Sequence, residues 1–248
     1  MKKDLAVIVP ARLKSVRFPR KLLYEIHGRP LILWTAHRLT HICVDIPVVF
    51  AVEDSELEDL LLSEDFKVHR TRGDHLSGTD RIAEVNETLG ARHVINVQAD
   101  EPLVTARQIQ TLRELVHGAV DMATLAFPIK TEADFRNPNC VKVALDSKGR
   151  ALYFSRSPIP HPREEPSQFS DDWFQQNPCY HHIGIYAYKQ EFLSAFSSLP
   201  QGRLERLECL EQLRALEYGY SVGVGISHEP TIGVDTLEDV DRIQELLR

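Results

Sequence analysis

Short runs of β-branched and other apolar residues alternate with helical patterns along this sequence. The runs are bounded by turn residues, as buried strands are, and comprise Leu5–Val9, Pro47–Val52, His93–Val97, Met122–Phe127 and Val141–Leu145. Helix-like spacing falls between several of them, at Leu31–Leu39, Ser55–Leu62, Asp80–Leu89 and Ala106–Val116. Two of these helices carry predicted capping boxes, Ser55 with Glu58 and Thr105 with Gln108. The alternation predicts an α/β fold with a mostly parallel sheet covered by helices.

The length of 248 residues is enough for one large domain with a small appended lobe. We expect a single domain over residues 1–248. The stretch Ser157–Pro178 is rich in proline and polar residues, and a strand at Ile183–Tyr188 follows, then helices at Lys189–Ser197 and Arg206–Tyr218. We therefore expect a lobe that binds substrate or forms a dimer contact within about residues 151–188.

Charge and cysteine content limit the possible partners. The formal net charge of −7 argues against non-specific binding to nucleic acid or to anionic membranes. The apolar run before Pro10 is too short for a signal peptide or a spanning helix, so a cytoplasmic protein is expected. The four cysteines are widely spaced and predict reduced thiols rather than a disulfide framework or a zinc site.

The segment Pro10–Lys21 is rich in cations and directly follows the first predicted strand. A junction of strand and loop with exposed amides and cations can bind polyphosphate. A solvated basic loop is the plainer interpretation, and only the position after the first strand favours a functional one. The glycine patterns of dinucleotide-binding and P-loop proteins are absent from this segment, which argues against oxidoreductase and ATPase functions.

Two aspartates are candidates for a metal site. Asp100 follows the apolar run Val94–Val97 after two intervening residues, and carboxylates at the carboxyl end of a strand can reach a ligand crevice. Asp235 precedes the last helix, where Thr236 and Asp239 form the predicted cap and leave Asp235 without that role. Each aspartate alone is equally compatible with a turn. Together at one crevice, they would suit Mg²⁺ whose other ligands are phosphates.

A further segment, His75–Arg81, has small residues at the start of a helix. Such a turn can offer amides and hydroxyls to a ligand, although it is more often only a helix start.

Taken in order along nearly the whole chain, these motifs resemble the CMP-Kdo synthetases, which are 3-deoxy-manno-octulosonate (Kdo) cytidylyltransferases. The matching segments are Pro10–Lys21, His75–Arg81, Val97–Pro102, Asn137–Lys142, Ala151–Arg156, His182–Tyr186, Leu210–Arg214 and Gly233–Thr236. The resemblance implies a three-layer α/β/α nucleotide-diphospho-sugar transferase-like fold with a smaller sugar-binding and dimerisation lobe. It also implies a homodimer that acts in lipopolysaccharide synthesis.

The resemblance assigns roles to individual positions. The nucleotide-binding set would be Ala11, Arg12, Ser15, Lys21, Ser77, Gly78, Arg81 and Gln98. The sugar-binding set would be Arg156, His182, Tyr186, Glu211 and Gln212. Asp100 and Asp235 would hold Mg²⁺ and, with Arg12 and Lys21, would form the catalytic set. The implied reaction is attack of the 2-hydroxyl of Kdo on the α-phosphorus of CTP, with no side chain nominated as general base.

The chain departs from the family pattern at two positions, and alternatives remain for the substrate. Arg20 stands where the family has glycine in its phosphate loop, which removes easy access to positive φ, and Ala99 replaces glycine before Asp100. The acceptor could instead be 8-amino-Kdo or a nonulosonic acid such as sialic acid. A non-catalytic nucleotide-binding protein that has kept the fold is the alternative from another class.

Overall fold

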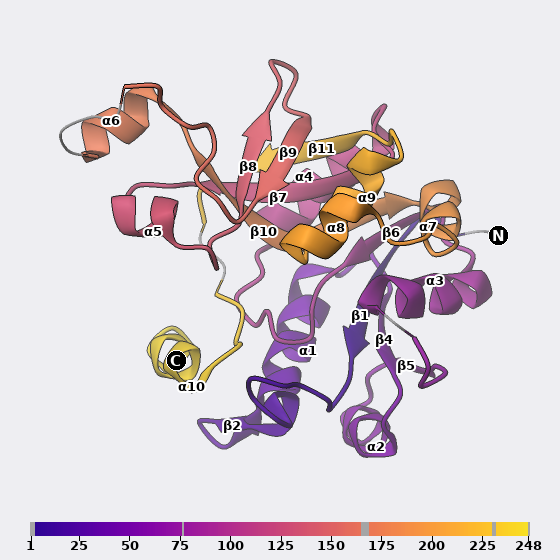
Figure 1. Ribbon diagram of the computed structural model, residues 1–248. Helices are drawn as coiled ribbons and strands as arrows, with labels where there is room; N and C mark the ends of the chain where they lie inside the picture. The colour runs from indigo at the N-terminus through magenta and orange to yellow at the C-terminus, as the bar shows by residue number, and fades with distance from the viewer. Residues whose placement is uncertain (1–2, 76, 165–168, 230–231, 248) are drawn as a thin grey trace.

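The computed structural model describes residues 3–75, 77–164, 169–229 and 232–247 (Figure 1). Within these residues, nine strands form one sheet. They are β1 (Leu5–Ala11), β4 (Val48–Val52), β5 (Val68–Arg70), β6 (His93–Asn96), β7 (Met122–Pro128), β8 (Lys142–Leu145), β9 (Ala151–Ser155), β10 (Tyr180–Lys189) and β11 (Val222–Ile226). A small antiparallel pair, β2 (Glu25–Ile26) and β3 (Arg29–Pro30), lies outside it.

The main path of the sheet is ordered β11-β7-β10-β6-β1-β4-β5. Strand β1 pairs in parallel with both β4 and β6, and β11 pairs in parallel with β7. Strand β10 runs antiparallel to its neighbours β6 and β7, and the β8–β9 hairpin continues from the start of β10. The predicted mostly parallel α/β sheet is thus confirmed, with β10 as a reversed strand inside it.

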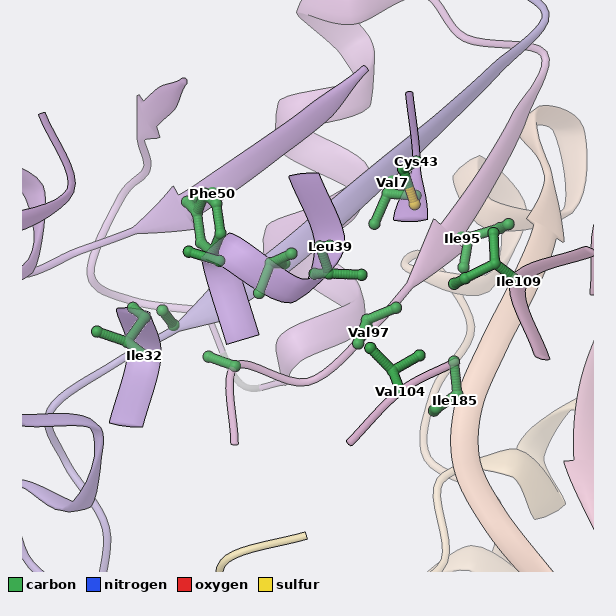
Figure 2. Packing of buried hydrophobic residues seen from close by; sticks show 14 of the residues in the cluster. Val7, Ile32, Leu39, Cys43, Phe50, Ile95, Val97, Val104, Ile109 and Ile185 are labelled. Carbon is green, nitrogen blue, oxygen red and sulfur yellow. The ribbon is translucent and has the colours of Figure 1, made fainter. Parts of the chain in front are cut away.

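Helices cover both faces of this sheet. They are α1 (Leu31–Ile42), α2 (Ser55–Ser63), α3 (Gly78–Leu89), α4 (Ala106–His117), α5 (Glu132–Arg136), α6 (Asp171–Gln176), α7 (Gln190–Phe196), α8 (Arg203–Glu208), α9 (Gln212–Glu217) and α10 (Leu237–Gln244), with a 3₁₀ turn η1 (Lys21–Leu23). One core packs the sheet against α1, α2, α4 and α10, as Figure 2 shows in part. The other core packs it against α3, α7 and α9.

The alternation of side chains along β1 explains the two cores. Val7 and Val9 face the core of α1 and α4, whereas Ala6 and Ile8 face the core of α3 and α7. All four side chains are fully buried. A strand covered on both faces must be apolar at every position, which is why the sequence shows a continuous run here instead of an alternating one.

Two local predictions were wrong. The N-cap residue of α2 is Asp54 and not Ser55, and its side chain makes no capping hydrogen bond, because the Asp54 carboxylate accepts a 2.8 Å hydrogen bond from the backbone N–H of Leu13. The predicted helix Arg206–Tyr218 is two short helices, because Cys209 adopts a left-handed conformation (φ 52°) between α8 and α9. The Thr105–Gln108 capping box is confirmed.

Residues 151–188, the expected lobe, contribute to two parts of the molecule. Strand β10 belongs to the central sheet, while α6 packs with α5 in a separate small aromatic cluster around Phe135, Phe169 and Phe174. In Figure 1, α5 and α6 project beyond the sheet on the side of β8 and β9. Among the residues that the structure describes, no helix has the length and apolar character needed to cross a lipid bilayer.

Candidate functional site

A cavity of about 650 Å³ lies beyond the carboxyl ends of β1 and β6. The loop after β1, the turn after β6 and the segment before α10 line it. Its lining residues are Pro10, Arg12, Lys14, Ser15, Val16, Arg17, Lys21, Leu22, Gln98, Ala99, Asp100 and Asp235. The carboxyl ends of parallel strands are where ligands bind in open α/β sheets, so this cavity lies at the expected edge.

The loop that carries the cations is attached to the scaffold at its start and is closed on itself at its end. At its start, the Leu13 N–H is bonded to Asp54, the residue that precedes α2. At its end, the Arg20 N–H donates to the Leu13 carbonyl at 3.3 Å, which closes the loop on itself. Arg12 and Ser15 face the cavity from within this loop. The attachment holds the loop beside the sheet edge while its side chains stay available for an anion.

Lys21 joins the two predicted metal ligands. Its Nζ lies 2.9 Å from Asp235 Oδ1 and also contacts the Asp100 carboxylate. Burial disfavours the charge on Lys21, but the two carboxylates outweigh that effect and hold its pKa above the ordinary value. Asp100 and Asp235, 135 positions apart in the chain, therefore converge on one positive centre.

Arg17 is a site residue that the sequence prediction did not nominate. Its Nη2 lies 2.7 Å from Asp235 Oδ2, and it lines the cavity. Burial alone would raise the pKa of Asp235, but Lys21 and Arg17 lower it below its usual value. The signal was present in the sequence, since Arg17 is one of the cations of the same loop.

Glu101 is the second residue that was missed. Its Oε2 is buried, and the desolvation of the carboxylate, together with the charges of the two aspartates, raises its pKa to about 8. Gly233 makes room for it, since a Cβ at that position would come within 2.9 Å of Glu101 Oε1. The Val234 N–H then donates to the Asp100 carbonyl at 3.0 Å. These contacts fix the segment of Asp235 against that of Asp100.

The predicted cap beside Asp235 is confirmed. Thr236 and Asp239 form a capping box at the start of α10, and the backbone N–H of Asp235 also donates to the Asp239 carboxylate. The side chain of Asp235 takes no part in that cap and points to Lys21 and Arg17 instead. The cap therefore fixes the backbone of Asp235, and its carboxylate remains available to contact the two cations.

The two departures from the family pattern have small consequences for the cavity. Arg20 takes the left-handed conformation (φ 58°) that glycine adopts freely, and its guanidinium pairs with Glu56 on α2 at 2.6 Å. Arg20 is not among the residues that line the cavity. Ala99 does line it, and its carbonyl accepts a 2.8 Å hydrogen bond from Thr35 of α1. Arginine at this position therefore adopts a backbone conformation that glycine favours, and its side chain points to α2.

A second cavity of about 140 Å³ lies between β6, β10, α3 and the start of α9. It is lined by Gly78, Thr79, Asn96, Gln98, Met122, Tyr186, Tyr188, Phe196, Glu211 and Gln212. Gln98 lines both cavities, so the two compartments meet at that side chain. Five of the predicted nucleotide- and sugar-binding residues thus come together here, namely Gly78, Gln98, Tyr186, Glu211 and Gln212.

Two polar groups in the second cavity, the Tyr186 hydroxyl and Glu211 Oε1, are poorly matched by protein partners. The Tyr186 hydroxyl donates to Gln212 Oε1 at 3.4 Å, a long contact. Glu211 Oε1 is buried, and no hydrogen-bond partner for it occurs among residues 3–75, 77–164, 169–229 and 232–247. Burial also raises the pKa of Glu211. Buried polar atoms without partners are costly, which makes this cavity suited to a hydroxyl-rich ligand.

The remaining predicted site residues lie outside the linings of these two cavities and contact their neighbours. The Ala11 carbonyl accepts a 2.9 Å hydrogen bond from Arg81, whose other partner is Glu53. The Ser77 hydroxyl caps α3 through Asp80. Arg81 thus braces the start of the phosphate-binding loop from a buried position instead of facing an open pocket.

Arg156 and His182, two predicted sugar ligands, are also held by protein groups. The Arg156 guanidinium donates to the backbone carbonyls of Glu208 and Pro138, at 2.7 and 3.1 Å. His182 is buried next to β7, 3.0 Å from Thr124 Oγ1, and burial lowers its pKa to about 3. It is therefore neutral at pH 7 and contacts Gln212, which lines the second cavity.

A cation-rich loop after the first strand of an α/β sheet, in contact with two carboxylates beside a large cavity, suits a nucleotidyltransferase, and the comparisons with known proteins show that class. Residues 6–226 match the family model described as cytidylyltransferase. The 3-deoxy-manno-octulosonate cytidylyltransferase of Syntrophotalea carbinolica is 42% identical over 248 residues, covering 99% of both chains. That of Syntrophobacter fumaroxidans is 45% identical over 247 residues, covering 97% of this chain and 95% of its own.

A solved structure gives the same result. A CMP:2-keto-3-deoxy-manno-octonic acid synthetase complexed with CTP superposes with a TM-score of 0.89 at 34% identity, covering 99% of this chain and 98% of its own. The chain belongs to the cytidylyltransferase family and, within it, to the 3-deoxy-manno-octulosonate cytidylyltransferases.

Proposed function

We propose that this protein transfers CMP from CTP to 3-deoxy-D-manno-octulosonate, giving CMP-Kdo for lipopolysaccharide synthesis and releasing pyrophosphate. One observation carries the proposal beyond family membership. Gln98 lines both the large cationic cavity and the smaller polar one, and Asp100, two residues further along the chain, lines the large one. A nucleotide in the first cavity and an acceptor in the second would therefore meet at the carboxylates, as a direct transfer requires.

The large cavity would bind CTP through its phosphates. Arg12, Arg17 and Lys21 supply cations around it, and Ser15 adds a hydroxyl. Guanidinium groups bind phosphate in a bidentate way, and the charge on Lys21 is already stabilised in place. These groups would neutralise charge on the leaving pyrophosphate. Ala11, Ser77 and Arg81 would act indirectly, since they set the start of the loop and of α3.

The small cavity would take the sugar. Tyr186, Glu211 and Gln212 offer a hydroxyl, a carboxyl and an amide to it, which suits several sugar hydroxyls. The Gln212 side chain also lies 3.5 Å from the buried ring of His182, a long contact that leaves its amide available to a ligand. Arg156 is the predicted partner of the sugar carboxylate. Its guanidinium would have to give up hydrogen bonds to the backbone carbonyls of Glu208 and Pro138 in order to bind that carboxylate.

We propose Mg²⁺ as the cofactor, held by Asp100 and Asp235. The donor set fits, because two carboxylates converge on one cationic group and oxygen ligands are what Mg²⁺ prefers. When bound, the ion supplies charge neutralisation at the phosphates and lowers the pKa of a bound hydroxyl. Glu101 and the Val234 N–H keep the two aspartate segments together. No side chain of the cavity is assigned as general base.

Pyrophosphate release with CTP and a panel of acidic sugars tests the proposal. We expect Mg²⁺-dependent release with Kdo that exceeds release with 8-amino-Kdo and with sialic acid. Greater release with either of those two would assign the protein to that sugar instead. Tight CTP binding without release for any acidic sugar would make it a non-catalytic nucleotide-binding protein. Omission of Mg²⁺ in each reaction separates the cofactor assignment from the substrate assignment.

We further propose a cytoplasmic homodimer. The four cysteines are free thiols, as suits a reducing compartment that supplies CTP. Leu152 on β9 and Leu207 on α8 are 62% and 69% exposed and could be covered in such a contact. A mass measurement in solution checks the dimer, and Leu152→Lys should weaken it if β9 lies in the contact.

A further inference from the structure

Three potential metal ligands meet at the amino end of the central strands, away from the proposed active site. They are Asp4, which precedes β1, His93, the first residue of β6, and His117, the last residue of α4. One ligand atom from each lies within 4.8 Å of the others. The two imidazole rings are 4.2 Å apart between centroids. His117 Nε2 lies 3.0 Å from Asp4 Oδ2.

The backbone holds Asp4 and His93 in place. The His93 N–H donates to the Asp4 carbonyl at 3.0 Å, and the Arg92 N–H donates to the Lys3 carbonyl at the same distance. The next residue along, Leu5, pairs in the sheet with His93. Two of the three side chains are thus attached to adjacent, hydrogen-bonded backbone positions. Little ordering would be needed for them to grip an ion together.

His117 is oriented by a bond on its other nitrogen. Its Nδ1 lies 2.6 Å from the Arg113 carbonyl one turn earlier in α4, which fixes the proton on Nδ1 and directs Nε2 toward Asp4. A carbonyl that receives the second ring N–H is a usual feature of metal-binding histidines. His93 is only partly accessible at the start of β6.

We propose that Asp4, His93 and His117 form a binding site for a divalent transition-metal ion, with Zn²⁺ as the representative of the class. Two imidazoles and one carboxylate are ligands that suit Zn²⁺, and water would complete its coordination. Mg²⁺ prefers oxygen ligands and is not expected here. Arg92 and Lys189 lie near this cluster, and their positive charges lower its affinity for a cation. Neither side chain occupies the site.

The role of this site is structural. Strand β1 has seven residues, so about 20 Å separates its amino end from the active-site loop at its other end. The start of β1 pairs with the start of β6, at the end of the sheet opposite to the loop that follows β1 (Figure 1). An ion bound there would connect the first residues of the chain to β6 and α4. It would leave the proposed chemistry at Asp100 unaffected.

Zn²⁺ titration of the full-length protein in excess Mg²⁺ tests the proposal, together with the absorption spectrum of bound Co²⁺. We expect one site whose affinity falls at least about tenfold in His93→Ala and in His117→Ala, with loss of the Co²⁺ bands. His41→Ala, an exposed histidine at the end of α1, is the matched control and should bind as the original protein does. Asp100→Asn should also keep the site, which separates it from the catalytic carboxylates.

Equal Zn²⁺ affinity in the His117→Ala and His41→Ala variants would overturn the proposal, as would a loss smaller than tenfold in both histidine variants. Misfolding of the histidine variants could also abolish Zn²⁺ binding, so Asp4→Asn is tested as well, because Asp4 is exposed and lies outside the sheet. We expect this variant to fold, and to lose Zn²⁺ affinity in the same way. Zn²⁺ should raise the thermal midpoint of the original protein and not that of Asp4→Asn. The same rise in both proteins would also overturn the proposal.

Discussion

Lys21 Nζ lies 2.9 Å from Asp235 Oδ1, although 214 positions separate the two residues in the chain. The contact depends on three local features. The loop after β1 closes on Leu13 and returns to the sheet at η1. Gly233 leaves space for the Glu101 side chain beside it. The capping box of α10 fixes the backbone of Asp235. The same ammonium contacts Asp100. A charge network of this kind is sensitive to the loss of any member.

Asp100→Asn should lower turnover at least about a hundredfold, the usual effect of removing a key electrostatic group. The change keeps the size of the side chain but removes a charge that Lys21 and the proposed Mg²⁺ need. Steady-state pyrophosphate release at saturating CTP and Kdo is the measurement. Asp59→Asn, an exposed aspartate on α2, is the matched control and should retain normal turnover. Near-normal release by Asp100→Asn would rule out the metal assignment.

Arg12→Ala should raise the KM for CTP much more than the KM for the sugar, because Arg12 faces the large cavity and not the small one. Arg20→Ala is a matched control in the same loop. Its guanidinium pairs with Glu56 outside the cavity, so both KM values should change little. An equal rise of both KM values in Arg12→Ala would contradict its assignment to the phosphates.

The sequence indicated much of this fold, for physical reasons that are local. Runs such as Leu5–Val9 are apolar at every position because helices cover both faces, and the Thr105 and Thr236 caps depend on residues three positions apart. The failures were also local. A left-handed Cys209 divides a pattern that is otherwise helical, and nothing in residue type predicts that φ.

The site was predicted less completely than the fold. The positions of Arg12, Lys21 and Asp100 after predicted strands placed them at strand ends, but contacts between distant segments decide which side chains face a cavity. Arg81 is buried against Glu53 and the Ala11 carbonyl, which no spacing rule indicates. Glu101 is beside Asp235 only because Gly233 leaves space for it. Such relations need the packed structure.

His182 should make stability depend on pH. Its pKa is about 3 in the folded protein and near 6.5 when unfolded, so unfolding takes up a proton below pH 6.5. The stabilising effect of the neutral ring is complete above pH 6.5 and is lost as the pH falls. Between pH 6.5 and 5 this loss amounts to about 2 kcal/mol.

Urea unfolding at several pH values measures this effect. His182→Gln should be less stable near neutral pH but should show a flatter decline between pH 6.5 and 5. The matched control is His41→Gln, whose exposed side chain should leave the slope unchanged. The same slope in His182→Gln and in the original protein would show that another group titrates in this range.

Arg214 and Glu205 form a buried pair that connects α9 to α8, with Nη2 2.6 Å from Oε1 and Nε 2.8 Å from Oε2. Arg214→Met should lower the free energy of unfolding by about 3 kcal/mol, because it leaves the Glu205 charge buried without a partner. The double variant Arg214→Met with Glu205→Leu should recover much of that loss, since neither charge then remains. Urea unfolding of the single and double variants gives both values.

The KM for the sugar should rise in Arg214→Met, because Gln212 begins the same helix, and should return toward normal in the double variant. Destabilisation below about 1 kcal/mol in Arg214→Met would mean that water reaches Glu205 and that the pair is not what holds α9 in place.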